Sequence, residues 1–273
     1  SDFYTSLNDL RRVKELARQN QPPNAANLEA IAIITQVWAF QILTDAYGDI
    51  PFTEALQGSA NRDPAYTPQE EIYPALADSL DRALGLIQTG SGPAGDLVHG
   101  GDMTKWSRFA NGLKMRLGIR AADANPQFAE TVINEANGNA LQGNADNTYF
   151  QFGTSSTHRN TYYENRFVDG RDDFDASERF VQALKQYSAN DPRLDAFVEQ
   201  TSDSAPPCED GSGNYDGFPY GMEQSVAQGR QTSRPTCNES RPEPFFSAGP
   251  SGSGDAYAPM MYYDEVLITK AEA

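Results

Sequence analysis

The sequence predicts a mainly α-helical fold of stacked α-hairpins, followed by long irregular loops. In the first half, apolar residues recur every three to four positions, which is the spacing of one helix face. These segments are bounded by glycine, proline or polar residues that suit helix ends. Residues 201–259 are dense in glycine, proline and serine, which favour irregular structure. The paired helices indicate tetratricopeptide-like stacking, although no repeat of fixed period is clear.

The first two predicted helices cover residues 1–20 and 27–47. The first is amphipathic, with arginines and lysine between its leucines, and the Gln21-Pro-Pro sequence ends it. The second is apolar nearly all round, as expected of a central buried helix, and it contains Trp38. Gly48 suits the left-handed position after a helix, and Pro51 prevents its continuation.

The next helices are predicted from their start signals. Thr67-Pro68-Gln69-Glu70 has the pattern of a capping box with proline at N1, and it opens a helix to about Gln88. Asp102 or Thr104 can cap a helix whose apolar stripe includes Trp106. Asn125-Pro126 caps a further helix that ends at Gly138.

The second half has fewer helices and more aromatic loop. Residues 141–175 are polar and aromatic, and the capping-box pattern of 175–178 predicts a helix to about Ser188. Asp191-Pro192 starts a short piece, and residues 260–273 are predicted to form a last helix. A structureless loop as long as 201–259 is unusual unless it has a function or is disordered.

Composition excludes several functional classes. The net charge of −17 argues against binding a phosphate backbone, so we expect no nucleic-acid partner. No run of about 18 apolar residues occurs, so no transmembrane helix is predicted. The two histidines, His99 and His158, cannot form a three-histidine metal site, and no nucleophile-elbow, Walker or zinc-protease motif occurs. We therefore expect no catalytic residues, no cofactor and no metal.

Two features leave alternatives open. Cys208 and Cys237 would close a loop of about 30 residues if bonded, for about 3–4 kcal/mol of stability and an extracytoplasmic setting. The alternative is two free buried thiols. The acidic segment 169–175 is interpreted as a solvated turn rather than a calcium loop, because Phe180 occupies the twelfth position where a calcium loop has glutamate.

Six sequence blocks, in order, resemble the SusD/RagB family of outer-membrane nutrient-binding lipoproteins of the Bacteroidota. The blocks are LTDAYGDIPFTE at Leu43–Glu54, PAYTPQEEIY at Pro64–Tyr73, GDMTKWSRFANGLKMRLGIR at Gly101–Arg120, ADNTYFQF at Ala145–Phe152, DPRL at Asp191–Leu194 and YYDEVLITKAEA at Tyr262–Ala273. Gly112 stands where the family more often has serine.

The resemblance implies a function. It implies a single SusD-like domain over residues 1–273, without the family's N-terminal lipidated segment and C-terminal helical region. Such a protein binds oligosaccharide at the cell surface without catalysis and delivers it to a SusC-like TonB-dependent transporter. Its lipid anchor would lie outside this sequence. The alternatives are a RagB-like peptide-binding import subunit, an extracellular polysaccharide hydrolase and a helical scaffold with only protein partners.

The blocks that carry the resemblance are interpreted as structural. Asp45 and Asp49 lie at a predicted helix C-terminus, where negative charge opposes the helix dipole. We therefore expect each to bond an arginine of the next helical layer, Arg116 or Arg120. Trp38 and Trp106 are expected in the core.

Ligand contacts are expected from aromatic side chains in the loops, which the resemblance places on the ligand face. Tyrosine suits sugars because its ring is apolar and its hydroxyl is polar. The candidates are Tyr162, Tyr163, Arg166, Tyr215, Phe218 and Tyr220, with Tyr257 a weaker one.

Overall fold

The computed structural model describes residues 2–90, 92–171, 175–188, 191–198, 215, 217–223, 225–226 and 252–273. The chain divides into two compact units. Unit 1 comprises Ser1–Phe150 and Pro259–Ala273, and unit 2 comprises Gln151–Ala258. Cys208 and Cys237 lie outside the described residues, so their pairing stays a prediction.

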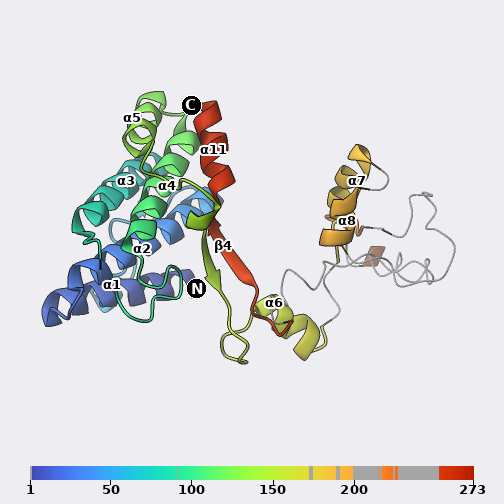
Figure 1. Cartoon of the computed structure of the whole chain (residues 1–273), viewed down its shortest axis with the longest axis horizontal. Helices are drawn as coiled ribbons and strands as arrows, with labels where there is room; N and C mark the ends of the chain where they lie inside the picture. Colours follow the sequence, from blue (N-terminus) through green and yellow to red (C-terminus); the bar gives the residue numbers. More distant parts are fainter. Residues whose placement is uncertain are drawn as a thin grey trace. The chain divides into compact units, whose positions relative to one another are not determined.

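Unit 1 confirms the predicted fold of packed helical hairpins (Figure 1). Each helix packs against the next in sequence from α1 to α5, and α11 packs against α4. The helices are α1 (Asp2–Asn20), α2 (Ala25–Tyr47), α3 (Gln69–Leu86), α4 (Met103–Ala121), α5 (Pro126–Ala136) and α11 (Tyr263–Glu272). Two short 3₁₀ helices, η1 (Gly58–Ala60) and η2 (Asn144–Asp146), lie in the connections.

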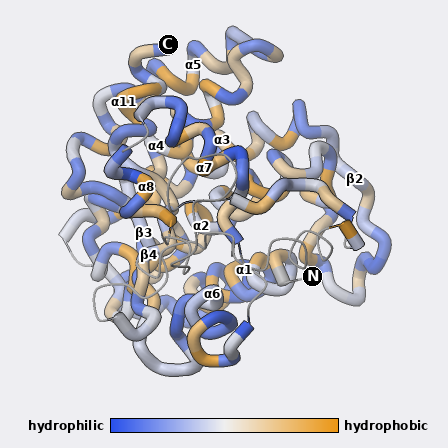
Figure 2. Tube along the Cα trace, turned by 90° about the vertical axis from the view of Figure 1, so that its right-hand side faces the viewer, coloured by the Kyte–Doolittle hydropathy of each residue, from blue (hydrophilic) through white to orange (hydrophobic). Residues whose placement is uncertain are grey.

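The core of unit 1 is centred on α2 and α4. Trp106, Phe109 and Leu113 of α4 are each at most 1% exposed, and Trp38 of α2 is partly buried against the same core. Hydrophobic and hydrophilic residues are interspersed along the helices of unit 1 (Figure 2). α2 has the length and composition of a membrane span, but 61% of its most apolar window is buried inside the protein. It is therefore interpreted as a core helix.

Local signals determine several helix ends. Asp102 accepts hydrogen bonds from the backbone N–H groups of Thr104 and Lys105, at 2.9 and 3.2 Å. Asn125 caps α5 in the same way, and Gly48 after α2 has the predicted positive φ, 72°, although its ψ of −119° lies outside the left-handed helical region. These three predictions are confirmed.

The predicted capping box before α3 is wrong. The Thr67 hydroxyl bonds the Thr53 hydroxyl at 3.0 Å and makes no cap. Asp49 supplies the capping carboxylate instead, because its Oδ1 accepts the Gln69 N–H at 2.9 Å. The pairing of β1 (Ile50–Pro51) with β2 (Tyr66–Thr67) brings the two segments together.

The predicted last helix begins later than expected. Met260 and Met261 belong to strand β4 (Tyr257–Met261), which pairs with β3 (Thr148–Gln151), and only then does α11 begin. A Cβ atom placed on Gly112 would collide with the Met261 side chain. Gly112 therefore leaves room beside α4 for the Met261 side chain.

Unit 2 contains short elements around irregular chain. Among the described residues they include α6 (Thr161–Tyr163), the π-helix η3 (Glu164–Val168), α7 (Glu178–Tyr187) and α8 (Pro192–Phe197). A small apolar cluster of Ala176, Val181, Leu184, Leu194 and Val198 joins α7 to α8. Asp191-Pro192 starts α8 as predicted, and the Asp191 carboxylate accepts the Arg193 N–H. The predicted capping box at 175–178 is wrong, because α7 begins at Glu178 after Ser177, whose side chain makes no capping hydrogen bond.

Candidate ligand-binding site

Tyr162, Tyr163 and Arg166 lie on α6 and the π-helix that follows it. Asn160 starts this segment, because its Oδ1 accepts the N–H groups of Tyr162 and Tyr163. The Arg166 guanidinium donates a hydrogen bond to the Tyr162 hydroxyl oxygen at 3.0 Å. The same guanidinium stacks over Phe167, 4.8 Å from the ring centroid. π-Helical turns are rare and occur often at functional sites.

The Tyr163 ring is held from two directions. Its centroid lies 5.2 Å from that of Phe167, and its hydroxyl donates to the Gly252 carbonyl oxygen at 3.2 Å. Phe167 is 41% exposed. The first three candidates thus form one cluster with Phe167, which was not among the residues predicted from sequence. A ring beside a guanidinium can offer a sugar both a stacking face and a hydrogen-bond donor.

Tyr215 and Phe218 lie against α7 and α8. The Phe218 backbone bonds Ala176 and Glu178 at 2.7 and 2.8 Å, which fixes it to the start of α7. The Tyr215 carbonyl oxygen accepts a hydrogen bond from Lys185, and its hydroxyl donates to Asp195. Their contacts hold these two residues in the packing of unit 2.

Tyr220 differs from these two neighbours because its side chain is 89% exposed. Tyr187, at the end of α7, is 78% exposed and lies under the Arg193 guanidinium at 5.2 Å. The sequence did not indicate Tyr187 as a binding candidate, because this residue falls at the end of a predicted helix rather than in a loop. The sequence signal that could have indicated this candidate is its position immediately before the polar segment 188–191.

The acidic residues of the YGDIP block have structural partners. Asp45 forms an ion pair with Arg120, 3.2 Å from its Nε, and accepts the Tyr73 hydroxyl at 2.5 Å. Burial and the Asp45 carboxylate raise the pKa of Tyr73. The predicted arginine partner is confirmed for Asp45 and wrong for Asp49, which caps α3.

Arg116, the other predicted partner, lies in a different contact. Its guanidinium pairs with Glu265 of α11 and donates to the Met260 carbonyl oxygen at 2.8 Å. This arginine therefore ties α4 to the end of β4 and to the helix that follows.

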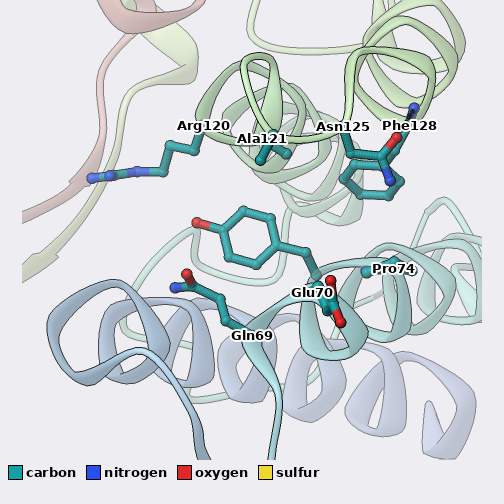
Figure 3. Close-up of a pocket in the computed structure, with 9 residues that line it drawn as sticks. Gln69, Glu70, Pro74, Arg120, Ala121, Asn125 and Phe128 are labelled. Atoms are coloured by element: carbon teal, nitrogen blue, oxygen red, sulfur yellow. Dashed lines mark hydrogen bonds between the residues drawn. The ribbon is translucent and has the colours of Figure 1, made fainter.

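A pocket of about 210 Å³ opens beside the Asp45 cluster. Gln69, Glu70 and Pro74 of α3 face Ala121, Asn125 and Phe128 across it, with Arg120 at one end (Figure 3). Its volume is below the roughly 300–1,000 Å³ of pockets that enclose drug-sized ligands. We therefore expect it to hold no more than a small group.

Comparison with known proteins identifies the class. The family model described as "Starch-binding associating with outer membrane" matches residues 1–273. The chain therefore belongs to the SusD-like family. No curated protein matches its sequence.

Solved structures agree with this assignment. A chitin-binding protein is 25% identical with a TM-score of 0.76, and the match covers 98% of this chain and 55% of that one. A SusD homologue from Bacteroides uniformis is 27% identical with a TM-score of 0.74, covering 98% and 51%. A chitin-binding SusD homologue from Flavobacterium johnsoniae, at 20% identity and TM-score 0.68, covers 93% and 49% and supports the fold. The chain spans about half the length of these proteins.

Within the described residues, no group of three or more histidine, cysteine, aspartate or glutamate side chains could hold a metal ion. The acidic segment 169–175 is only partly described, because residues 172–174 lie outside the described ranges. Its interpretation as a solvated turn stays a prediction.

Proposed function

We propose that this chain is a non-catalytic, glycan-binding subunit on the outer surface of the cell. A lipid anchor outside this sequence would attach it to the outer membrane, and it would deliver oligosaccharide to a SusC-like TonB-dependent transporter. The observation that carries the proposal is the match of the starch-binding, outer-membrane family along residues 1–273. Two of its structural neighbours are described as chitin-binding.

The chemistry of unit 2 supports a sugar ligand. Sugars present C–H faces that stack on aromatic rings, and hydroxyls that bond guanidinium and amide groups. Tyr162, Tyr163, Arg166 and Phe167 combine these groups in one cluster. Tyr220 adds an exposed ring elsewhere in the unit. Open contacts of this type give about 4–6 kcal/mol of binding free energy, or dissociation constants from roughly mM to tens of µM.

Isothermal titration calorimetry with chitin-derived and starch-derived oligosaccharides tests the proposal. We expect saturable binding of at least one series in that affinity range, and no released products when the polymer is incubated with the protein. Peptide binding without any carbohydrate binding would instead establish a RagB-like import subunit. Released oligosaccharide products would establish a hydrolase.

The transporter partner needs a separate experiment. Pull-down of the full-length lipoprotein from detergent-solubilised outer membranes should recover a TonB-dependent β-barrel. Recovery of other proteins without any such barrel would favour the helical-scaffold alternative.

A further inference from the structure

A second pocket in unit 1 has a different chemical character. It lies between α1, α2, α3 and the segment after β1, with a cavity volume of about 220 Å³. The charged side chains that line it are Arg11, Lys14 and Arg82, and all three are basic. We call it the basic pocket. The whole chain carries a net charge of −17, so a pocket whose charged lining residues are all cations stands out.

The positive charge of this pocket is only partly compensated. Arg11 pairs with Glu15, but among the described residues no carboxylate forms an ion pair with Lys14 or Arg82. Lys14 donates to the neutral Gln36 amide oxygen at 2.5 Å. Burial lowers the pKa of Lys14, and the nearby Arg82, Arg18 and Arg11 lower it further, against the opposing effect of Glu29. An anion placed here would relieve this repulsion.

The neutral polar groups of the pocket already have partners. The Gln36 amide nitrogen donates to the Leu7 carbonyl oxygen at 2.8 Å, while its oxygen accepts from Lys14. The Ser79 hydroxyl donates to the Ala75 carbonyl oxygen at 2.8 Å. The donors left for a ligand are therefore mainly those of the Lys14 ammonium and the Arg82 guanidinium, since Arg11 already bonds Asn8 and Glu15, and cationic donors suit a carboxylate better than sugar hydroxyls.

The remaining wall is apolar. The rings of Phe40 and Phe52 meet edge to face, with centroids 4.9 Å apart, and Val37 and Leu76 are buried beside them. Leu56 lines the pocket with a φ of 65°, a left-handed conformation that a leucine rarely adopts. Such strained residues cluster at ligand-binding sites. An apolar group beside the anion would bury itself against this wall.

We propose that the basic pocket binds the free carboxyl terminus of a peptide chain whose last residue is apolar. The carboxylate meets Lys14 and Arg82, and the last side chain packs on Phe40 and Phe52. The volume accommodates one such residue and is below that of pockets for drug-sized ligands, which argues against a long acyl chain or an oligosaccharide. This site is in unit 1 and does not depend on the glycan binding proposed above.

Fluorescence anisotropy with a labelled pentapeptide ending in leucine tests this proposal. We expect the free acid to bind at least tenfold more tightly than the same peptide with a C-terminal amide, because the amide loses the charge-assisted contacts. Equal affinity of the two forms, or no binding of the acid, would overturn the proposal. Hexanoate competing as well as the unlabelled peptide would overturn the peptide assignment.

Three variants locate the effect. Lys14→Gln and Arg82→Gln should each weaken binding of the acid about tenfold and leave binding of the amide unchanged. Arg82 is exposed and forms no hydrogen bond or ion pair with another described residue, so its replacement leaves the fold intact. Arg12→Gln is the matched control, since Arg12 lies on the same helix as Lys14, carries the same charge and does not line the pocket. An equal loss in Arg12→Gln would mean that only the net charge matters and would overturn the site.

Discussion

Unit 1 and unit 2 hold their side chains in different ways. In unit 1, long helices bury large side chains such as Trp106 and Phe109 in one continuous core. In unit 2, the described residues form a small apolar cluster around Val181, and aromatic rings such as Tyr187 and Tyr220 lie exposed. Binding residues lie disproportionately on irregular segments carried by a rigid scaffold. The comparison therefore supports the proposal that unit 1 provides stability and unit 2 contacts the glycan.

The largest expected effect is the loss of a core ring from unit 1. Trp106→Ala should lower the free energy of unfolding by about 3–5 kcal/mol, because it leaves a cavity and removes one of the hydrogen-bond donors to Asp96. In unit 2, Val181→Ala removes two methyl groups from a small cluster and should cost only about 1–2 kcal/mol. Chemical denaturation gives both values.

Hydrogen exchange then locates the two effects. Val181→Ala should speed exchange in α7 and α8 and leave α2 and α4 protected. Equal global destabilisation by both variants would contradict the assignment of stability to unit 1.

The second effect depends on pH and on the loop before α4. His99 lies edge-on to Trp106, with centroids 5.3 Å apart, and burial lowers the pKa of its imidazole to about 4. An unfolded histidine titrates with a pKa near 6.5. Between these values the unfolded chain binds a proton that the folded chain does not, so stability falls as pH decreases from about 6.5 to 4. The loss should approach about 2–3 kcal/mol.

His99→Gln isolates this contribution. The free energy of unfolding is measured by denaturation at about pH 7 and pH 4.5, because most of the histidine titration falls between these two values. The difference between the two free energies should be smaller for the variant than for the parent, since glutamine does not titrate. Asp96, whose carboxylate accepts the Trp106 indole N–H at 2.7 Å, contributes its own acid sensitivity to both proteins. An unchanged difference would show that His99 is already accessible to protons in the fold.

A smaller effect is expected where this chain departs from the family pattern. Gly112→Ser restores the commoner residue but places a side chain against Met261, and overpacking of this kind costs about 1–3 kcal/mol. Met261→Ala in the same background should recover part of the loss, giving a favourable coupling energy in a double-mutant cycle. If the effects of the two substitutions were additive, the serine side chain would not be in conflict with Met261, which would mean that α4 and β4 separate easily.

Prediction from sequence succeeded where the cause is local. Features that depend on a few neighbouring residues could be predicted from their sequence patterns. Examples are the caps at Asp102 and Asn125 and the turn at Gly48. Prediction failed where a partner is distant in sequence. Thr67 has the pattern of a cap, yet Asp49 reaches Gln69 from 20 positions away and takes that role.

The candidate site shows the same division. Tyr162, Tyr163 and Arg166 were selected together because they are close in sequence, and a helical turn, which was not predicted, brings the Tyr162 and Arg166 side chains into contact. The sequence could not predict that Tyr215 is held by Lys185 and Asp195, which depends on the packing of α7 against α8. The basic pocket could not be predicted from the sequence for the same reason, since Lys14 and Arg82 are brought to one pocket only by the tertiary structure.

The smallest expected change in stability tests the role of unit 2 most directly. Tyr220→Ala removes an 89% exposed ring and should change the free energy of unfolding by less than about 0.5 kcal/mol. If its ring stacks on the sugar, oligosaccharide affinity should fall about five- to tenfold, equivalent to about 1–1.5 kcal/mol. Tyr66→Ala is the matched control, because Tyr66 is 70% exposed but belongs to unit 1. An affinity loss in Tyr66→Ala with none in Tyr220→Ala would reverse the comparison and place glycan contact on the helical unit.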